Sequence, residues 1–201
     1  MPTWNHTYSV HVTLPQRLKE PVQTAPTVLF VGGEYCPYCA ATRWALTIAL
    51  SRFGTFSGVR YMYSASHNPY GQPETPPDIA TMTYYGSHYR SHLIAVDLVE
   101  EWSRSYHALQ RLTPREVGLV DRYDQPPFTY PNDRFSIPFI IIGGRFLWTA
   151  APYQPVVLSG YTWSGILRAI RSGSGPVAHD IFASANEYTA AICLSDGNRP
   201  H

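Results

Sequence analysis

The stretch that decides the fold is Thr27-Val-Leu-Phe-Val-Gly-Gly-Glu-Tyr-Cys-Pro-Tyr-Cys39. Its first five residues are apolar or β-branched and are closed by two glycines, which predicts a short buried strand. The run from Ala40 to Phe53 contains no Gly or Pro and stops at Gly54. This pattern predicts a helix of about three to four turns. The two cysteines therefore lie where a strand passes into a helix.

This position favours ionisation of the Cys36 thiol. A sulfur atom in the first turn of a helix lies at the positive end of the helix dipole, beside unpaired backbone N–H groups. The thiolate is the species that attacks disulfides. Cys39 follows one helical turn later, where it can resolve a mixed disulfide on Cys36. Pro37 is tolerated between them because its missing N–H has no intrahelical acceptor there. We expect a lowered pKa for Cys36 but not for Cys39.

The remaining elements predict an α/β domain. The strand expected at 59–64 completes a β-α-β unit, which favours parallel pairing with the strand at 27–31. Thr113-Pro-Arg-Glu116 is a capping box that begins a helix reaching about Tyr123. The expected elements of the rest of the chain are strands at 81–85 and 91–99, a hairpin of 139–142 and 145–148 around Gly143-Gly144, and helices at 163–170 and 176–193.

Length and composition indicate a single globular domain. The chain has 201 residues, a net charge of +1 and 44% hydrophobic residues. We expect one domain over 1–201, with a strand-rich insertion at 67–132. The near-neutral charge gives no reason to expect nucleic acid as a partner. The longest apolar run is five residues, 190–194, which excludes a membrane span or signal-peptide core in the chain as given.

The cellular compartment stays open from the sequence. Lys19 is the single lysine against 14 arginines, and 15 tyrosines and 18 prolines are present. A surface of Tyr, Thr, Ser and Pro with few charges favours a compartment outside the cytoplasm. Genomic base composition is an equal explanation for the excess of arginine.

The cysteine pair also has a metal-binding interpretation, which the rest of the sequence does not favour. Zinc normally needs two such pairs, or one pair with spaced histidines. The only other cysteine is Cys193, and His88 and His92 are the sole close histidine pair, in a strand-like segment. We expect no metal and no cofactor, with both histidines on the surface. Cys193 is either a buried inert thiol, a third redox thiol or a thiol that pairs with a cysteine of a partner.

The chain resembles the thioredoxin superfamily in two blocks, residues 27–64 and 136–171. The first holds Cys-Pro-Tyr-Cys, which is also common in glutaredoxins, and the second is Ser136-Ile-Pro-Phe139 followed by the hairpin. The resemblance implies that Cys36 and Cys39 are catalytic. It further implies a cis-proline, Pro138, packed against the dithiol. The side chains implied to form the groove for an extended substrate are Ile137, Pro138, Pro37 and Tyr38.

Three further motifs are similar to a prokaryotic thioredoxin-like family catalogued as domain of unknown function 929. They are Gly33-Glu-Tyr-Cys-Pro-Tyr-Cys-Ala-Ala-Thr-Arg-Trp44, Leu50-Ser-Arg-Phe-Gly-Thr-Phe-Ser-Gly58 and Thr189-Ala-Ala-Ile-Cys193. This resemblance covers nearly the whole chain. It implies the fold and the redox dithiol but no substrate.

Departures from the superfamily pattern favour an oxidase or isomerase over a reductase. Thioredoxins keep a buried Asp six residues before the first cysteine, where this chain has Phe30. Neither Gly-Gly pair is followed by the Asp of the glutaredoxin glutathione site. The 102-residue separation of Cys36 from Pro138 is longer than in a compact thioredoxin. An insertion between the two halves resembles the disulfide-oxidase branch.

We therefore expect a thiol–disulfide oxidoreductase that exchanges disulfides with protein substrates and needs an unidentified electron donor or acceptor. The alternative is a binding or scaffold module of the same fold whose dithiol is a structural disulfide. The 67–132 insertion is expected to dock on the central sheet and to extend beside the dithiol as a lid or a substrate wall. Tyr84, Tyr85 and Tyr89 are then either an exposed surface for a peptide or cross-strand pairs that stabilise a sheet.

Overall fold

The computed structural model describes residues 14–19 and 27–195 of the chain. These residues form a mixed α/β fold built around one five-stranded sheet. The helices and strands are, in chain order, β1 (Gln16–Arg17), β2 (Val28–Gly33), α1 (Pro37–Leu50), β3 (Thr55–Ser57), β4 (Arg60–Tyr63), β5 (Ala80–Thr83), β6 (His88–Arg90), β7 (Val96–Trp102), α2 (Pro114–Tyr123), β8 (Phe139–Ile142), β9 (Phe146–Trp148), α3 (Trp163–Ser172) and α4 (Gly175–Ser195).

The central sheet has the strand order β1-β9-β8-β2-β7. Strand β2 lies parallel to β7 and antiparallel to β8, and all residues of β2 and β8 are buried. The predicted β8–β9 hairpin is confirmed. Gly143 and Gly144 turn the chain there with φ angles of 59° and 60°, a conformation that residues with a Cβ rarely adopt.

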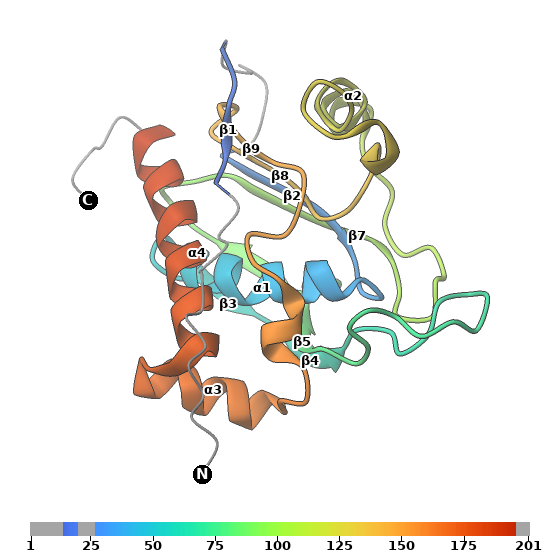
Figure 1. Ribbon diagram of the computed structural model, residues 1–201. Coiled ribbons are helices and arrows are strands. Elements are labelled where there is room, and N and C mark those ends of the chain that lie inside the picture. Colours follow the sequence, from blue (N-terminus) through green and yellow to red (C-terminus); the bar gives the residue numbers. More distant parts are fainter. Residues whose placement is uncertain (1–13, 20–26, 196–201) are drawn as a thin grey trace.

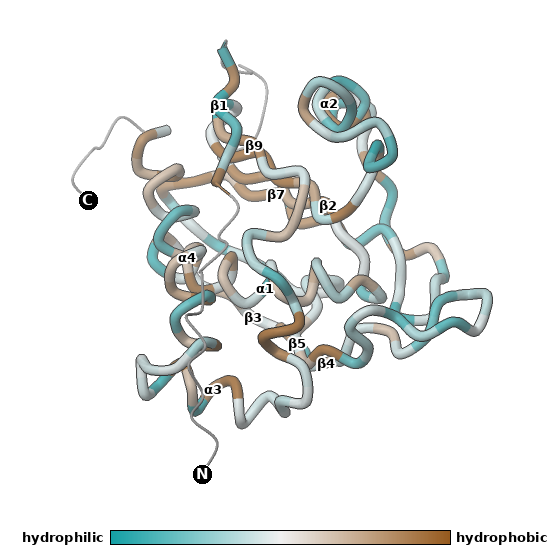
Figure 2. Tube along the Cα trace, in the orientation of Figure 1, coloured by the Kyte–Doolittle hydropathy of each residue, from teal (hydrophilic) through white to brown (hydrophobic). Residues whose placement is uncertain are grey.

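Helices cover both faces of this sheet, as Figure 1 shows: α1 and α4 lie on one side and α2 lies on the other. The two cores use alternate residues of β2, because successive side chains of a strand point to opposite faces. Phe30 packs in the core that includes α1 and α4, whereas Leu29 packs with Leu119 and Tyr123 of α2. Hydrophobic residues accordingly concentrate along the central strands (Figure 2).

One prediction about the sheet is wrong. The strand at 59–64, observed as β4, pairs antiparallel with β5 in a separate two-stranded sheet and is not the parallel neighbour of β2. That neighbour is β7, which lies inside the 67–132 segment. The residues of β7 are buried or half-buried as far as Glu101, as a strand beside β2 with helices over both faces of the sheet must be. Arg60 and Tyr61 of β4 are exposed, so β4 does not meet that requirement.

The predicted helix boundaries hold best where the sequence carries caps. Helix α2 begins at Pro114 behind the Thr113–Glu116 capping box, with both reciprocal hydrogen bonds present. Helix α3 ends at Gly173, which has a φ of 64°. No helix within residues 14–19 and 27–195 is long and apolar enough to cross a membrane.

The three tyrosines predicted as an exposed surface do not form one. Tyr84 is only 3% exposed. Its hydroxyl group lies 2.9 Å from the Thr47 hydroxyl and also donates to the Arg43 carbonyl at 3.3 Å. Tyr89 is half-buried and stands opposite Phe56 in the β3–β6 ladder. Tyr85 alone of the three is exposed. The cross-strand interpretation therefore holds for Tyr89, whereas Tyr84 lies just outside β5 and packs in the core. The hydroxyl groups of both tyrosines form hydrogen bonds with residues of α1.

Candidate active site around Cys36 and Cys39

Cys36 is the N-cap residue of α1, and its sulfur has two polar neighbours. The Cys39 backbone N–H donates to Cys36 Sγ at 3.2 Å, and the Cys36 thiol donates to the Ile137 carbonyl at 3.7 Å. Strand β2 ends at Gly33, and two residues, Glu34 and Tyr35, connect it to Cys36 at the start of α1. Both cysteines are free thiols. The fold thus brings together two thiols and a carbonyl oxygen from the segment that enters β8.

The two thiols have opposite tendencies to ionise. Burial works against ionisation of Cys36, but hydrogen bonds from Cys39 and the charge of Arg43 outweigh it and lower the pKa of Cys36. Burial raises the pKa of Cys39 well above its ordinary value, and the neighbouring Cys36 adds to this effect. The arrangement favours a thiolate on Cys36 and a protonated thiol on Cys39.

The residues predicted to form the substrate groove differ in accessibility. The Ile137–Pro138 bond is cis, and its position beside Cys36 agrees with the sequence prediction. Tyr38 is 38% exposed and Ile137 is half-buried, whereas Pro37 and Pro138 are buried. Cys36 itself is 5% exposed and Cys39 is fully buried. Tyr38 and Ile137 are therefore the accessible members of the predicted groove.

A buried ion pair lies next to the dithiol and was not anticipated from the sequence. The Arg43 guanidinium group donates from Nε and Nη2 to the two Glu100 carboxylate oxygens, each at 2.7 Å, and neither side chain has exposed surface. Nη2 also donates to the Gly33 carbonyl at 2.7 Å. Burial opposes the charge of Arg43, yet Glu100 holds the pKa of Arg43 above its usual range. The positive charge is therefore permanent.

Arg43 is placed to act on both thiols. It follows Cys39 by four residues on α1, so the two side chains share one face of the helix. Its Nη1 atom is buried without a hydrogen-bond partner. The signal in the sequence was a single arginine within Ala40-Ala-Thr-Arg-Trp-Ala-Leu46, since a charge in an otherwise buried helix needs a partner. Nothing in the local pattern points to Glu100 as that partner.

The other side of the site is built from aromatic and charged residues of three loops, which follow β2, β4 and β7. Tyr35 stacks on Tyr106 with ring centroids 4.3 Å apart, and the Tyr106 hydroxyl group donates to Glu74. Burial raises the pKa of Tyr35. Glu34 accepts a hydrogen bond from the Arg104 backbone N–H at 3.2 Å. Glu34 therefore has a structural contact at the rim of the site.

The remaining candidate residues lie away from the dithiol. Cys193 is half-buried near the end of α4, and Ser195 of the same helix end lies against Gly143. Gly143 follows the last residue of β8, at the opposite end of the sheet from the dithiol, because β8 runs antiparallel to β2. His88 and His92 are both exposed. No group of three or more His, Cys, Asp or Glu side chains within the described residues could hold a metal ion.

Comparison with known proteins places the chain in a family. No curated protein matches it, and no solved structure does either. A family model matches residues 18–194, far more than half of the chain. The matched segment includes the dithiol, the Arg43–Glu100 pair and the strand entered through Pro138. The chain therefore belongs to the family described as domain of unknown function DUF929.

Proposed function

We propose that this protein is a thiol–disulfide oxidoreductase of thioredoxin-like architecture that acts on protein substrates through Cys36 and Cys39. The observation that carries the proposal is the position of Cys36 Sγ, which accepts the Cys39 N–H at the start of α1 and lies 3.7 Å from the Ile137 carbonyl. A hydrogen-bond donor and a helix dipole at one sulfur atom stabilise a thiolate. The Ile137 carbonyl is a backbone acceptor for an extended substrate segment.

The exchange proceeds in two steps in the oxidising direction. A substrate thiolate attacks Cys36 Sγ of the Cys36–Cys39 disulfide, that S–S bond breaks, and Cys39 leaves and takes up a proton. A second substrate thiolate then attacks the substrate sulfur of the mixed disulfide, a substrate disulfide forms, and Cys36 leaves as a thiolate. Two electrons pass from the substrate to the protein. The disulfide of a partner protein restores the Cys36–Cys39 bond.

The electrostatics support oxidation or isomerisation over reduction. A dithiol whose reduced form is stabilised as a thiolate gives up its disulfide readily, which makes the protein an oxidant. Arg43 and the Cys39 N–H provide that stabilisation at Cys36. Phe30 stands where thioredoxins keep a buried carboxylate, and it is fully buried among apolar residues. The base that would deprotonate the resolving thiol of a reductase is therefore missing from that position.

Burial of the dithiol favours a second candidate, a binding or scaffold module in which Cys36 and Cys39 form a structural disulfide. Only 5% of Cys36 is exposed, so its side chain offers an attacking reagent little surface. Alkylation of the native protein separates the two candidates. After mild reduction, iodoacetamide modifies Cys36 rapidly in an oxidoreductase, whereas a structural dithiol is protected until the protein unfolds.

The decisive experiment mixes the oxidised protein with a reduced, unfolded ribonuclease A and follows the loss of substrate thiols. We expect substrate disulfides to form with the native protein and with Cys193→Ser, the matched control. Cys36→Ser should abolish the reaction. Cys39→Ser cannot form the disulfide, but after its Cys36 is converted to the mixed disulfide with Ellman's reagent, a substrate thiolate should displace thionitrobenzoate and leave a trapped Cys36–substrate disulfide. A reduction potential near about −120 mV supports an oxidase, and one near about −270 mV indicates a reductase. Equal thiol loss with and without Cys36 would reject the proposal.

A further inference from the structure

The outer edge of β7 leaves backbone hydrogen-bonding groups without partners. In a parallel pair of strands, alternate residues turn both their N–H and C=O groups toward the neighbouring strand. The Ala95 carbonyl accepts the Val28 N–H at 3.0 Å. The backbone N–H and C=O groups of the odd-numbered residues from Ala95 to Val99 therefore point toward β2. Glu100 faces the other way, because its N–H and C=O both pair with Gln110. The backbone N–H and C=O groups of Val96 and Leu98 therefore also point outward, away from β2.

No described residue occupies this part of the edge. Strand β7 is the last strand in the sheet order, and the segment 107–110 covers its edge only from Glu100 onward. Within residues 14–19 and 27–195, nothing accepts from the Val96 or Leu98 N–H or donates to their carbonyl groups on this side. An unpaired strand edge is a template for pairing with another extended chain, and most proteins cover or charge such edges.

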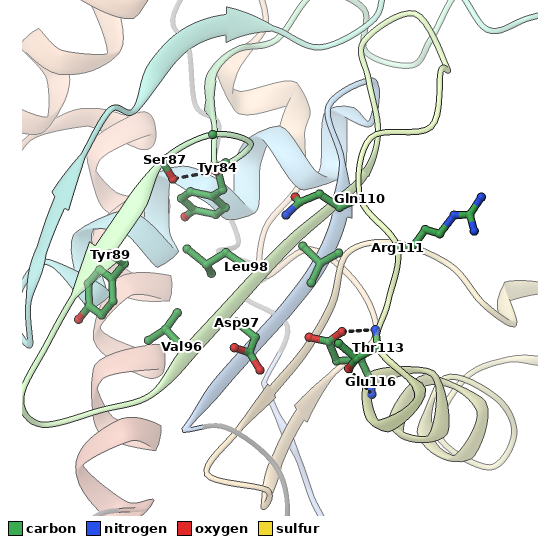
Figure 3. Close-up of a pocket in the computed structure, with 12 residues that line it drawn as sticks. Tyr84, Ser87, Tyr89, Val96, Asp97, Leu98, Gln110, Arg111, Thr113 and Glu116 are labelled. Carbon is green, nitrogen blue, oxygen red and sulfur yellow. Dashed lines mark hydrogen bonds between the residues drawn. The ribbon is translucent and has the colours of Figure 1, made fainter.

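A pocket of about 370 Å³ opens along the same stretch of β7 (Figure 3). One wall is apolar: Val96 and Leu98 point toward Tyr84 and Tyr89. The other wall is acidic, because Asp97 points to the opposite side of the strand, toward Glu116 of α2. The backbone edge runs between the two walls.

The acidic wall forms no ion pair within the described residues. Asp97 has no hydrogen bond or ion pair within the described residues, and Glu116 is engaged in the capping box through the Thr113 N–H at 2.6 Å. Arg111 lines the pocket, but its guanidinium group points away from both carboxylates in Figure 3. Burial and then the charge of Glu116 raise the pKa of Asp97, and the charge of Arg115 offsets only part of this effect. A basic side chain entering the pocket would relieve this repulsion.

We propose that the β7 edge at Val96 and Leu98 binds an extended, basic segment of a partner protein as an added strand. An extended backbone offers donors and acceptors at the spacing that this edge presents. Side chains on one face of the segment contact the half-buried Val96, Leu98 and Tyr89. A Lys or Arg on the opposite face reaches Asp97 and Glu116. This surface lies at the end of β7 away from Trp102 and the dithiol, so it goes beyond the proposed function.

The charges favour a partner protein over a second copy of this chain. An antiparallel pairing of two β7 edges would bring Asp97 and Glu116 of each copy close to the same residues of the other. Like charges across a strand pair are destabilising. The occupant therefore carries the opposite charge.

The test uses unfolded probes that cannot react with the dithiol. Reduced, carbamidomethylated ribonuclease A is the basic probe and carbamidomethylated α-lactalbumin is the acidic one. We expect the native protein and the Cys36→Ser/Cys39→Ser variant to bind the basic probe equally, as measured by fluorescence anisotropy. Hydrogen exchange should slow at the Val96 and Leu98 amides when the probe is present. Because neither probe has free thiols, a failure of the redox proposal does not affect this result.

Two variants separate the edge from the acidic wall. Leu98→Pro removes an N–H that faces away from β2, and it should weaken binding about fivefold relative to Leu98→Ala. Asp97→Asn/Glu116→Gln keeps the capping box, since Gln serves at that position, and should weaken binding of the basic probe about tenfold. Asp121→Asn, an exposed carboxylate on α2, is the matched charge control and should change nothing.

Several outcomes would overturn the proposal. One is equal binding of both probes. Another is probe binding without slower exchange at Val96 and Leu98. A third is slowed exchange at these amides that depends on protein concentration alone, with a dimer in sedimentation, because a second copy then occupies the edge.

Discussion

Cys36 and Cys39 are three residues apart, yet their sulfur atoms have different surroundings. Cys36 accepts a backbone N–H and lies beside a carbonyl group, while Cys39 Sγ lies against β2, only 3.2 Å from where a Cβ on Gly32 would stand. The same Cβ would overlap the Phe30 ring, so position 32 needs a glycine. The environment, and not the residue type, decides which thiol ionises.

The first prediction concerns these two pKa values. In a Cys39→Ser variant, the rate of Cys36 alkylation by iodoacetamide should titrate below 9.0, the ordinary cysteine value, because the hydrogen bonds and Arg43 remain. In Cys36→Ser, alkylation of Cys39 should titrate above 9.0, because burial raises its pKa. Identical pH profiles for the two variants would contradict the assignment.

The second prediction concerns Arg43. Arg43→Met leaves Glu100 as an unpaired buried charge and should lower the free energy of unfolding by about 3–5 kcal/mol in urea denaturation. Arg43→Met/Glu100→Leu removes both charges and should recover most of that loss. In both variants the pKa of Cys36 should rise, because the positive charge that lowers it is gone. Arg52→Met, which removes an exposed arginine just after α1, should leave the Cys36 pKa unchanged.

At the scale of elements, local signals in the sequence predicted where most helices and strands begin and end, but not which strands pair with each other. The β8–β9 hairpin, the capped start of α2 and the glycine stop of α3 each depend on a few neighbouring residues, and the structure confirms them. The pairing of β4 depends on distant contacts: Tyr61 and Tyr63 both pack against the Trp163 ring of α3. No local pattern carries that information.

In the candidate site too, features that depend on neighbouring residues were predictable and features that depend on distant contacts were not. Cys36, Cys39 and their place before a helix were predictable because they are contiguous in the chain. Pro138 was predictable only through the resemblance, since about a hundred residues separate it from the dithiol. The Arg43–Glu100 pair escaped prediction because it joins an arginine in a helix to a glutamate in a strand 57 residues away.

The third prediction tests the β5–β6 connection. Tyr84→Ser should lower the free energy of unfolding by about 3 kcal/mol or more, because a fully packed ring beside Phe30 and Phe56 is lost. Tyr85→Ser removes an exposed ring of the same type and should stay within about 0.5 kcal/mol. Thermal unfolding of the two variants measures the difference. Equal losses would mean that the contacts of Tyr84 with α1 do not stabilise this connection.

At the scale of the whole molecule, one buried carboxyl group should govern how stability depends on pH. Asp124 caps the end of α2, is 1% exposed and has an Oδ1 atom without a hydrogen-bond partner. Burial raises its pKa from 3.8 to about 7. The folded protein therefore holds a proton that the unfolded chain releases between these two values, so the free energy of unfolding falls as the pH rises through this range.

The fourth prediction follows from this loss of stability with rising pH. Asp124→Asn cannot ionise, so the variant should be more stable than the native protein at pH 8, by at most about 4 kcal/mol. The gain should shrink toward pH 4, where the folded protein keeps the carboxyl group protonated and the unfolded chain, with its pKa of 3.8, has it protonated nearly half of the time. Urea denaturation at the two pH values measures it. Asp133→Asn, an exposed carboxylate in the same connection, should leave the pH dependence unchanged.

The bidentate pair between α1 and β7 also has a consequence for the descent of the family. Replacing either Arg43 or Glu100 alone leaves an unpaired charge in the interior, whereas replacing both by apolar residues leaves an apolar contact. Natural selection should therefore have preserved or replaced the two positions together. Across homologous sequences, we expect arginine at position 43 to be accompanied by an acidic residue at position 100, and an apolar residue at one to be accompanied by an apolar residue at the other. A lineage that keeps the arginine opposite a leucine would have had to find its anion elsewhere, and the thiols beside it are the nearest groups that can become one.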